Sequence, residues 1–178
     1  RWTEDGWLCL ADGGKEPRVR VPVSWPVERK LEEEIRYLFQ GPDLSPDFFS
    51  LRVPLGEALS LTERPGWLRL TGKDSPNSRF EQSLVARRQE DFAFSFETEL
   101  DFEPSSERQM AGILYFYDEC DFYYLRVTCG QSGQKILDVM RMNRGKTEYV
   151  PDCGIAVPEG RSIRLKLVVR RTEASCYY

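Results

Sequence analysis

The chain has 178 residues, a formal net charge of −4 at pH 7 and no histidine. The missing imidazole excludes a Ser-His-Asp or Cys-His nucleophile system and a histidine-ligated zinc ion. The acidic balance argues against nucleic-acid binding, and no apolar run approaches the length of a membrane span. A chain of this length predicts one domain with a short appendage.

Residues 1–35 differ in composition from the rest and are predicted to form a tail and linker. Three tryptophans and an Asp-Gly-Gly turn surround an alternating segment at 18–23 that suits a short edge strand. The charged run at 28–36 is too short for a stable isolated helix. The sequence opens at Arg1 without a methionine and stops in a strand-like run at Tyr178, so we expect it to be part of a longer protein.

From residue 36 onward, short strands are separated by turn signals. Apolar side chains alternate with polar ones at 92–102, where Phe92, Phe94, Phe96, Leu100 and Phe102 share one face, and again at 162–170. Further strands are predicted at 67–70, 83–88, 110–117, 122–128 and 136–142, with a hairpin turn at 143–146. This pattern predicts an all-β fold, a two-sheet antiparallel β-sandwich with an N-terminal tail.

The segment 110–128 is the richest in aromatic residues. A turn at 118–121 would place Tyr117 opposite Phe122 and Tyr115 opposite Tyr124. One face of the hairpin would then be core, and the other would carry Tyr115, Tyr117, Phe122, Tyr124 and Arg126. Exposed tyrosines beside an arginine can stack on sugar rings, but they can equally pack against a neighbouring domain. The candidate site is therefore a carbohydrate-binding or domain-docking face formed by Tyr115, Tyr117, Tyr124 and Arg126.

The other chemistry-bearing residues have ordinary structural interpretations. Asp118, Glu119 and Asp121 could be imagined as a calcium loop or a catalytic acid pair, yet acidic residues are common at hairpin turns and the spacing is not that of an EF-hand. We therefore predict no metal, no cofactor and no catalytic residue in this chain. The five cysteines include no C-x-x-C pair and are expected to be free thiols, with a Cys120–Cys129 bridge as the alternative.

Several sequence blocks carry a family resemblance when they are taken together and in order. They are PGWLRL at 65–70, RFEQSLVARRQ at 79–89, QMAGI at 109–113 and DFYYL at 121–125. The segments FQGP at 39–42 and FSLR at 49–52 precede them. Together they resemble the C-terminal concanavalin A-like β-sandwich domain of glycoside hydrolase family 43 β-xylosidases. Residues 2–7, followed by Gly13-Gly14, look like the end of that family's catalytic domain.

The resemblance implies an accessory domain at 36–178 that packs on an upstream five-bladed catalytic propeller. The parent enzyme would be an inverting glycosidase that releases xylose, and sometimes arabinose, from xylo-oligosaccharides. The resemblance also implies that the sandwich continues beyond Tyr178, with a loop that helps to close the catalytic pocket. The chain departs from the family at Leu38 and Gln40, where acidic residues often flank the phenylalanine.

Three hypotheses follow for the function of the chain. The first is an accessory domain, inactive alone, that shapes the propeller's pocket. The second is an autonomous carbohydrate-binding module. The third is a structural domain for propeller docking or homo-oligomerisation. The expected partners are the upstream propeller and xylo-oligosaccharide, with no nucleic acid and no membrane, and the expected location is cytoplasmic because no signal-peptide pattern is visible.

Overall fold

The computed structural model describes residues 2–7, 34–150 and 154–178. The chain divides into two compact units, Arg1–Arg36 and Tyr37–Tyr178. The edge strand predicted at 18–23 and most of the charged run at 28–36 lie outside the described residues. In the first unit, the Thr3 amide donates to the Trp7 carbonyl at 2.8 Å and closes a tight turn. The second unit contains the sheets that position the candidate site.

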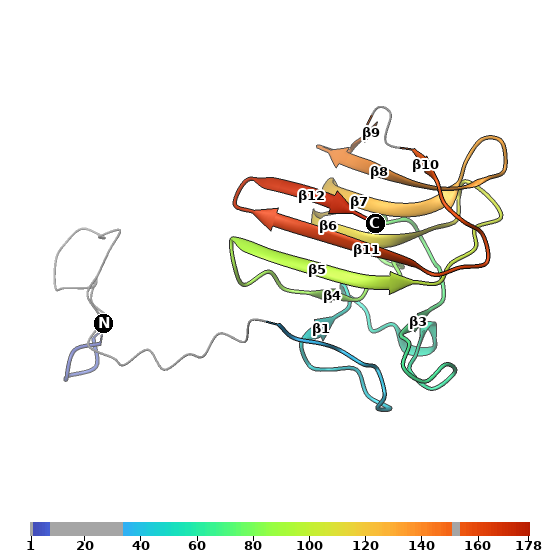
Figure 1. The fold of residues 1–178 in the computed structure, drawn as a ribbon. Coiled ribbons are helices and arrows are strands. Elements are labelled where there is room, and N and C mark those ends of the chain that lie inside the picture. Colours follow the sequence, from blue (N-terminus) through green and yellow to red (C-terminus); the bar gives the residue numbers. More distant parts are fainter. Residues whose placement is uncertain (1, 8–33, 151–153) are drawn as a thin grey trace. The chain divides into compact units, whose positions relative to one another are not determined.

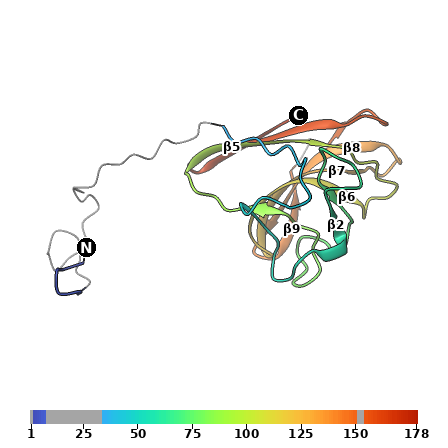
Figure 2. The same cartoon turned by 90° about the horizontal axis from the view of Figure 1, so that it is seen from below.

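Two antiparallel sheets face each other in the second unit (Figures 1 and 2). The smaller sheet has the order β12-β11-β5, and the larger has the order β10-β8-β7-β6 with β9 paired to β8. The strands of the smaller sheet are β5 (Ala93–Leu100), β11 (Ile163–Arg170) and β12 (Glu173–Tyr177). Those of the larger sheet are β6 (Met110–Asp118), β7 (Asp121–Cys129), β8 (Lys135–Asn143), β9 (Lys146–Tyr149) and β10 (Ile155–Ala156). The predicted all-β, two-sheet antiparallel sandwich is confirmed.

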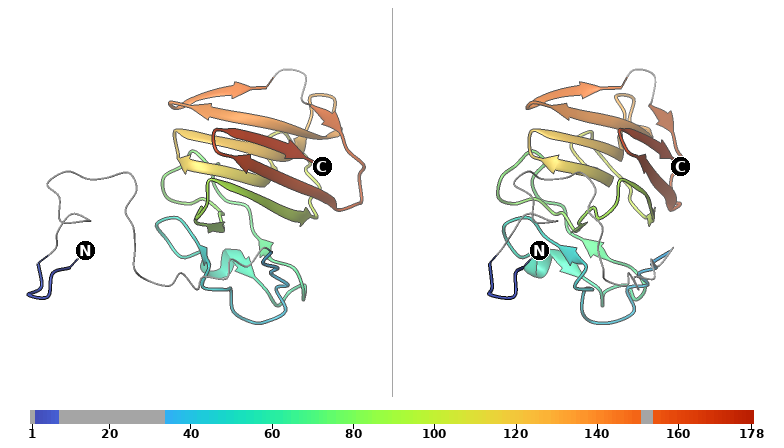
Figure 3. Two further views of the ribbon diagram at one scale, coloured as in Figure 1. Left: turned by 60° about the vertical axis from the view of Figure 1, so that its left-hand side comes forward. Right: turned by 90° about the vertical axis from the view of Figure 1, so that its left-hand side faces the viewer.

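Two short strand pairs lie at one side of the sandwich, on the segment between residues 48 and 87 (Figure 3). β1 (Phe48–Phe49) pairs with β4 (Ala86–Arg87), and β2 (Leu59–Ser60) pairs with β3 (Arg69–Leu70). A single 3₁₀ turn, η2 (Gly56–Ala58), precedes β2, and the described residues contain no α-helix. Within these described ranges, no helix has the length and apolar character that crossing a membrane requires.

The main hydrophobic core fills the space between the two sheets. Its most deeply buried side chains are Val127 of β7 and Leu165 and Val169 of β11, each of which contributes about 1.5–3 kcal/mol by burial. The alternation predicted at 162–170 is confirmed, because Leu165, Leu167 and Val169 are buried and Arg164 and Arg170 are exposed. On β5, Phe94 packs against this core, whereas Phe96 and Phe92, the residue before β5, remain exposed.

The opposite face of the larger sheet carries a second apolar cluster. Its buried members are Phe122, Tyr124, Met140 and Met142, with Met110, Leu114 and Phe116 packed against them. β7 therefore buries side chains on both of its faces, which is why its residues from Tyr124 to Cys129 are buried without interruption.

The hairpin turn predicted at 143–146 is confirmed. Asn143 pairs with Lys146 across the turn, so Arg144 and Gly145 form a two-residue loop. Both loop residues have positive φ, 49° and 75°, as a type I′ turn requires. The glycine adopts this conformation without steric cost, and the arginine does so with some strain.

Candidate functional site

A β-bulge at Tyr117 sets the register of the aromatic hairpin. Asp118 pairs with Asp121 across a two-residue turn, but the next pair is Phe116 with Phe122, so Tyr117 has no partner of its own. Each later pair is displaced by one residue from the regular pattern. The extra residue moves the side chains of β6 to the opposite face relative to β7.

The predicted pairing of Tyr115 with Tyr124 is therefore wrong, because Tyr115 lies opposite Tyr123 and Tyr124 lies opposite Leu114. The prediction for β7 itself is confirmed in one respect, since Leu125 and Val127 belong to the core between the sheets. The prediction for β6 is reversed. Tyr115 packs against that core, whereas Leu114 and Phe116 pack against the second cluster.

The four predicted site residues consequently do not form one platform. Tyr115 is half-buried on the inner face, and its hydroxyl donates to Gln89 Oε1 at 3.0 Å. Tyr117 is 86% exposed at the bulge. Tyr124 and Arg126 share the second face but are only 7% and 6% exposed. Sequence reasoning placed this second face in solvent because it did not anticipate the cluster of methionines on β8.

Arg126 is held by a charge pair within the larger sheet. Its guanidinium donates to Asp138 through Nε at 2.6 Å and through Nη2 at 3.0 Å, and the two residues are register partners on β7 and β8. Burial alone would lower the pKa of Arg126, but the hydrogen bonds and charge of Asp138 outweigh it and raise that pKa. Burial also raises the pKa of the Tyr124 hydroxyl, although the nearby Arg126 charge opposes the shift.

The acidic turn between β6 and β7 is used for local structure. Asp118 Oδ1 accepts from the Cys120 amide at 2.7 Å, and Asp121 Oδ1 accepts from the Arg144 amide at 3.0 Å. Glu119 forms ion pairs with Arg52 at 2.9 Å and Arg79 at 3.4 Å. These contacts favour the turn interpretation over an acid pair facing a substrate.

Two cysteines of the β6–β7 region lie within the described residues. Cys120 and Cys129 are free thiols, so the alternative disulfide between them is not formed. Cys120 lies in the turn before β7, and Cys129 ends that strand, so the length of β7 separates them. Across residues 2–7, 34–150 and 154–178, no group of three His, Cys, Asp or Glu side chains is arranged to hold a metal ion.

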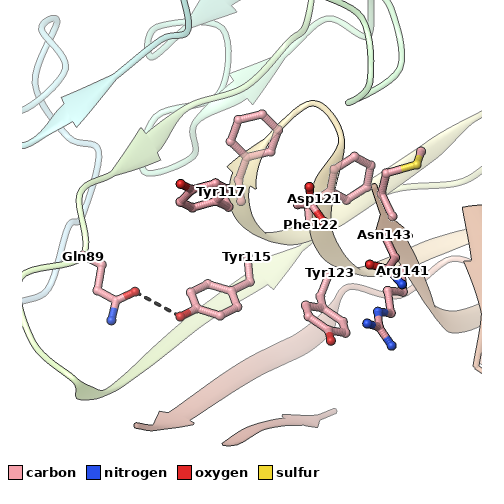
Figure 4. A pocket seen from close by; sticks show the side chains of 10 residues that line it. Gln89, Tyr115, Tyr117, Asp121, Phe122, Tyr123, Arg141 and Asn143 are labelled. Carbon is pink, nitrogen blue, oxygen red and sulfur yellow. Dashed lines mark hydrogen bonds between the residues drawn. The ribbon is translucent and has the colours of Figure 1, made fainter. Parts of the chain in front are cut away.

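A small cleft of about 240 Å³ opens at the β6–β7 turn end of the larger sheet (Figure 4). Tyr115, Tyr123 and Arg141 project into it as neighbours in one cross-strand row. The Arg141 guanidinium lies 5.5 Å from the centre of the Tyr123 ring. Sequence reasoning missed Tyr123 and Arg141, because Tyr115 meets Tyr123 only in the bulged β6–β7 register and Arg141 meets Tyr123 through the β7–β8 pairing. This cleft offers aromatic faces and a cation, and it offers no pair of carboxylates for hydrolysis.

The two-sheet sandwich with its aromatic cleft defines a β-domain of the concanavalin A-like class. Residues 36–178 match the family model described as "Beta xylosidase C-terminal Concanavalin A-like domain". The chain therefore belongs to this family, the C-terminal domains of glycoside hydrolase family 43 β-xylosidases.

Relatives and solved structures agree with this assignment. The chain is 36% identical to xylosidase/arabinosidase 43B of Humicola insolens over 99% of its own length, which is 34% of that protein. It is 37% identical to a xylan 1,3-beta-xylosidase of a Vibrio species over 92% of its length and 31% of that protein. The crystal structure of xylan beta-1,4-xylosidase from Bacillus halodurans C-125 superposes with a TM-score of 0.85 at 37% identity, over 99% of this chain and 34% of that one. The chain thus spans about a third of the proteins it resembles, and it is an accessory domain of a larger protein.

Proposed function

We propose that this accessory domain docks on an upstream catalytic propeller of a β-xylosidase or arabinosidase acting on xylo-oligosaccharides, and that it helps to shape the catalytic pocket. Family membership and the chain's share of about a third of its relatives support this proposal. The aromatic cleft is lined by one carboxylate, Asp121, and in the larger cleft Asp138 is held by Arg126, so we assign the hydrolytic groups to the upstream domain.

The observation that carries the proposal is the exposed apolar surface around the β6–β7 turn. Tyr117 is 86% exposed, and Phe80 is 67% exposed. Phe80 follows Arg79, and Val53 follows Arg52, and both arginines bind Glu119 in the turn. We call these residues, Val53, Phe80 and Tyr117, the docking edge. Exposed apolar side chains on segments that are tied to one turn suit an interaction surface.

The docking edge is held rigid before any partner arrives. Glu119 connects the turn to Arg52 and Arg79, and the Arg52 guanidinium also donates to the Arg79 carbonyl at 3.1 Å. Three loop segments that are distant in sequence are thereby fixed to one another. A preorganised surface loses less conformational entropy on docking than mobile loops would.

A longer protein that includes the upstream domain provides the test. The double variant Tyr117→Ala/Phe80→Ala is expected to lower its kcat/KM on an aryl xyloside by about tenfold and to separate the thermal transitions of the two domains. Ile155→Ala removes an exposed apolar side chain from β10, outside the docking edge, and serves as the matched control. Unchanged kinetics and an unchanged thermal profile in the double variant would contradict the docking assignment.

The 178-residue chain alone provides a second test. It is expected to show no turnover of an aryl xyloside, because the acidic side chains of the β6–β7 turn are engaged in local hydrogen bonds and ion pairs. Light scattering coupled to size exclusion then distinguishes docking from self-association. A chain that forms a stable dimer without the upstream domain would favour the oligomerisation role.

A further inference from the structure

A second and larger cleft, about 560 Å³ in volume, lies on the face of the larger sheet that carries the methionine cluster. Its floor is formed by side chains of β6, β7 and β8, among them Met110, Arg126 and Asp138. The loop with Ser75 and Asn77 lines it from outside the sheet, and Tyr149 lines it from β9. It is separate from the aromatic cleft at the β6–β7 turn, with which it shares only Met142.

We propose that this cleft binds a neutral sugar, namely a pentose unit of a short oligosaccharide. The cleft is lined by two arginines, Arg108 and Arg126, and by two carboxylates, Glu107 and Asp138. Its formal charge is therefore zero. A balanced cleft favours neither an anion nor a cation. It suits a neutral ligand with many hydroxyl groups and an apolar ring face.

The polar part of the proposed site is the Arg126–Asp138 pair. Asp138 takes two of the five guanidinium donors, a third lies 3.6 Å from the Met110 sulfur, and the Tyr149 hydroxyl is a further hydrogen-bond partner. Donor capacity therefore remains on Arg126 beside the lone pairs of Asp138. A donor next to an acceptor, both fixed in place, matches two neighbouring hydroxyl groups on a sugar ring.

The apolar part is supplied by Tyr149 and the methionines. The Tyr149 ring is 62% exposed, and its centre lies 5.4 Å from the Arg126 guanidinium carbon. Met140 is the register partner of Tyr149, and Met142 is the partner of Thr147. Tyr149 provides an aromatic face on which the C–H face of a pyranose ring can lie, and the two methionines, which are buried, form the floor beside it.

The loop wall adds a hydrogen-bonding group. Ser75 Oγ donates to Asn77 Oδ1, which orients the Asn77 amide and leaves its N–H donors without a hydrogen bond among the described residues. Ser78 Oγ donates to Asp74 Oδ2 at 2.9 Å, and this bond closes the base of the same loop. Asn77 is thus held at the rim as a donor for a hydroxyl oxygen.

The proposed function supports the choice of xylose-type sugars within this neutral class, and the test keeps the two proposals apart. The 178-residue chain is titrated with xylotetraose by calorimetry, with chemical-shift perturbation as the second readout. We expect weak, saturable binding with a Kd on the order of 1 mM or tighter, perturbing the signals of Arg126, Asn77 and Tyr149. Tetragalacturonate, which carries negative charge, is expected to bind at least tenfold more weakly.

Matched variants locate the site. Tyr149→Ala is expected to weaken xylotetraose binding at least tenfold, and Asn77→Ala at least threefold, because both side chains lie at the rim and leave the core intact. Tyr177→Ala removes an exposed tyrosine from β12, outside the cleft, and is expected to leave affinity unchanged. The absence of saturable binding, or equal affinity in the wild type and Tyr149→Ala, would overturn the proposal. Neither result contradicts the proposed docking role of the docking edge, because that role is tested separately in the longer protein.

Discussion

Arg126 and Asp138 lie directly opposite each other on β7 and β8 and share two hydrogen bonds, at 2.6 and 3.0 Å. Gly112 of β6 is the other register neighbour of Arg126. A glycine, an arginine and an aspartate therefore form one cross-strand row over β6, β7 and β8 of the larger sheet. Arg126 and Asp138 of this row also line the larger cleft, so a change in the row affects both the stability of the fold and that cleft.

The buried ion pair leads to the first prediction. Asp138→Asn is expected to destabilise the chain by about 3–5 kcal/mol, because the buried Arg126 charge then lacks its counter-charge. The double variant Arg126→Met/Asp138→Leu is expected to recover most of that loss, since it removes both charges together. Urea unfolding followed by circular dichroism measures both effects.

Arg141→Met is the control for this prediction. Arg141 and Glu148 form an exposed pair at 3.6 Å, and its loss is expected to change the free energy of unfolding by less than about 1 kcal/mol. A single variant Asp138→Asn as stable as this control would contradict the assigned role of the buried pair.

Gly112 leads to the second prediction. A Cβ atom at this position would collide with the Leu125 carbonyl oxygen and approach the Arg126 Cα to 2.9 Å. Both contacts are with backbone, which cannot move aside as a flexible side chain can. Gly112→Ala is therefore expected to destabilise the chain by about 1–3 kcal/mol and to lower its melting temperature by several degrees.

Gly41→Ala tests whether the Gly112 effect is steric. No atom lies within 4 Å of a Cβ built at Gly41. The melting temperature of Gly41→Ala is expected to stay within about 2 °C of that of the wild type. Equal effects of the two substitutions would show that the close approach of β6 and β7 has no energetic consequence.

The Glu119 carboxylate leads to the third prediction, a dependence of stability on pH. Its pKa is lowered first by a hydrogen bond from its own backbone amide and next by the hydrogen bond from Arg52, with the Arg79 charge adding to the shift. The folded pKa is therefore below the unfolded pKa, near 4.5. The stabilisation is fully present above the unfolded pKa and is lost as the pH falls through the folded pKa.

Unfolding experiments on the wild type and a Glu119 variant check the direction of this pH dependence. Glu119→Gln is expected to be less stable than the wild type at pH 7, with the difference shrinking as the pH falls below about 4. Glu159→Gln changes an exposed carboxylate outside the turn and serves as the control. A stability difference between wild type and Glu119→Gln that grows toward acid would contradict the predicted direction.

The β8–β9 turn leads to the fourth prediction. Arg144 has a φ of 49°, a conformation that asparagine and glycine adopt at lower cost. Arg144→Gly or Arg144→Asn is expected to keep or raise the melting temperature, whereas Gly145→Val is expected to lower it. Thermal unfolding of the three variants measures this order. A melting temperature for Gly145→Val at or above that of Arg144→Asn would refute it.

Local patterns in the sequence predict the fold class, several strands and the family. Alternation at 162–170 places Leu165 and Val169 inside because a pleated strand has a period of two, and the structure follows it. The Arg144-Gly145 turn is equally local, since its chemistry depends on the turn's own backbone angles. Ordered sequence blocks identified the family without any tertiary information.

The set of residues that meet at the candidate sites depends on how the strands are arranged in three dimensions. The bulge at Tyr117 exchanges the faces of β6, and nothing in the order of residues 110–128 distinguishes it from a regular hairpin. The burial of Tyr124 and Arg126 likewise depends on Met140, Met142 and Asp138 of β8, which sequence patterns do not align with β7. Strand periodicity is a local property, whereas register is set by the whole sheet, and a shift of one residue moves every later side chain to the other face.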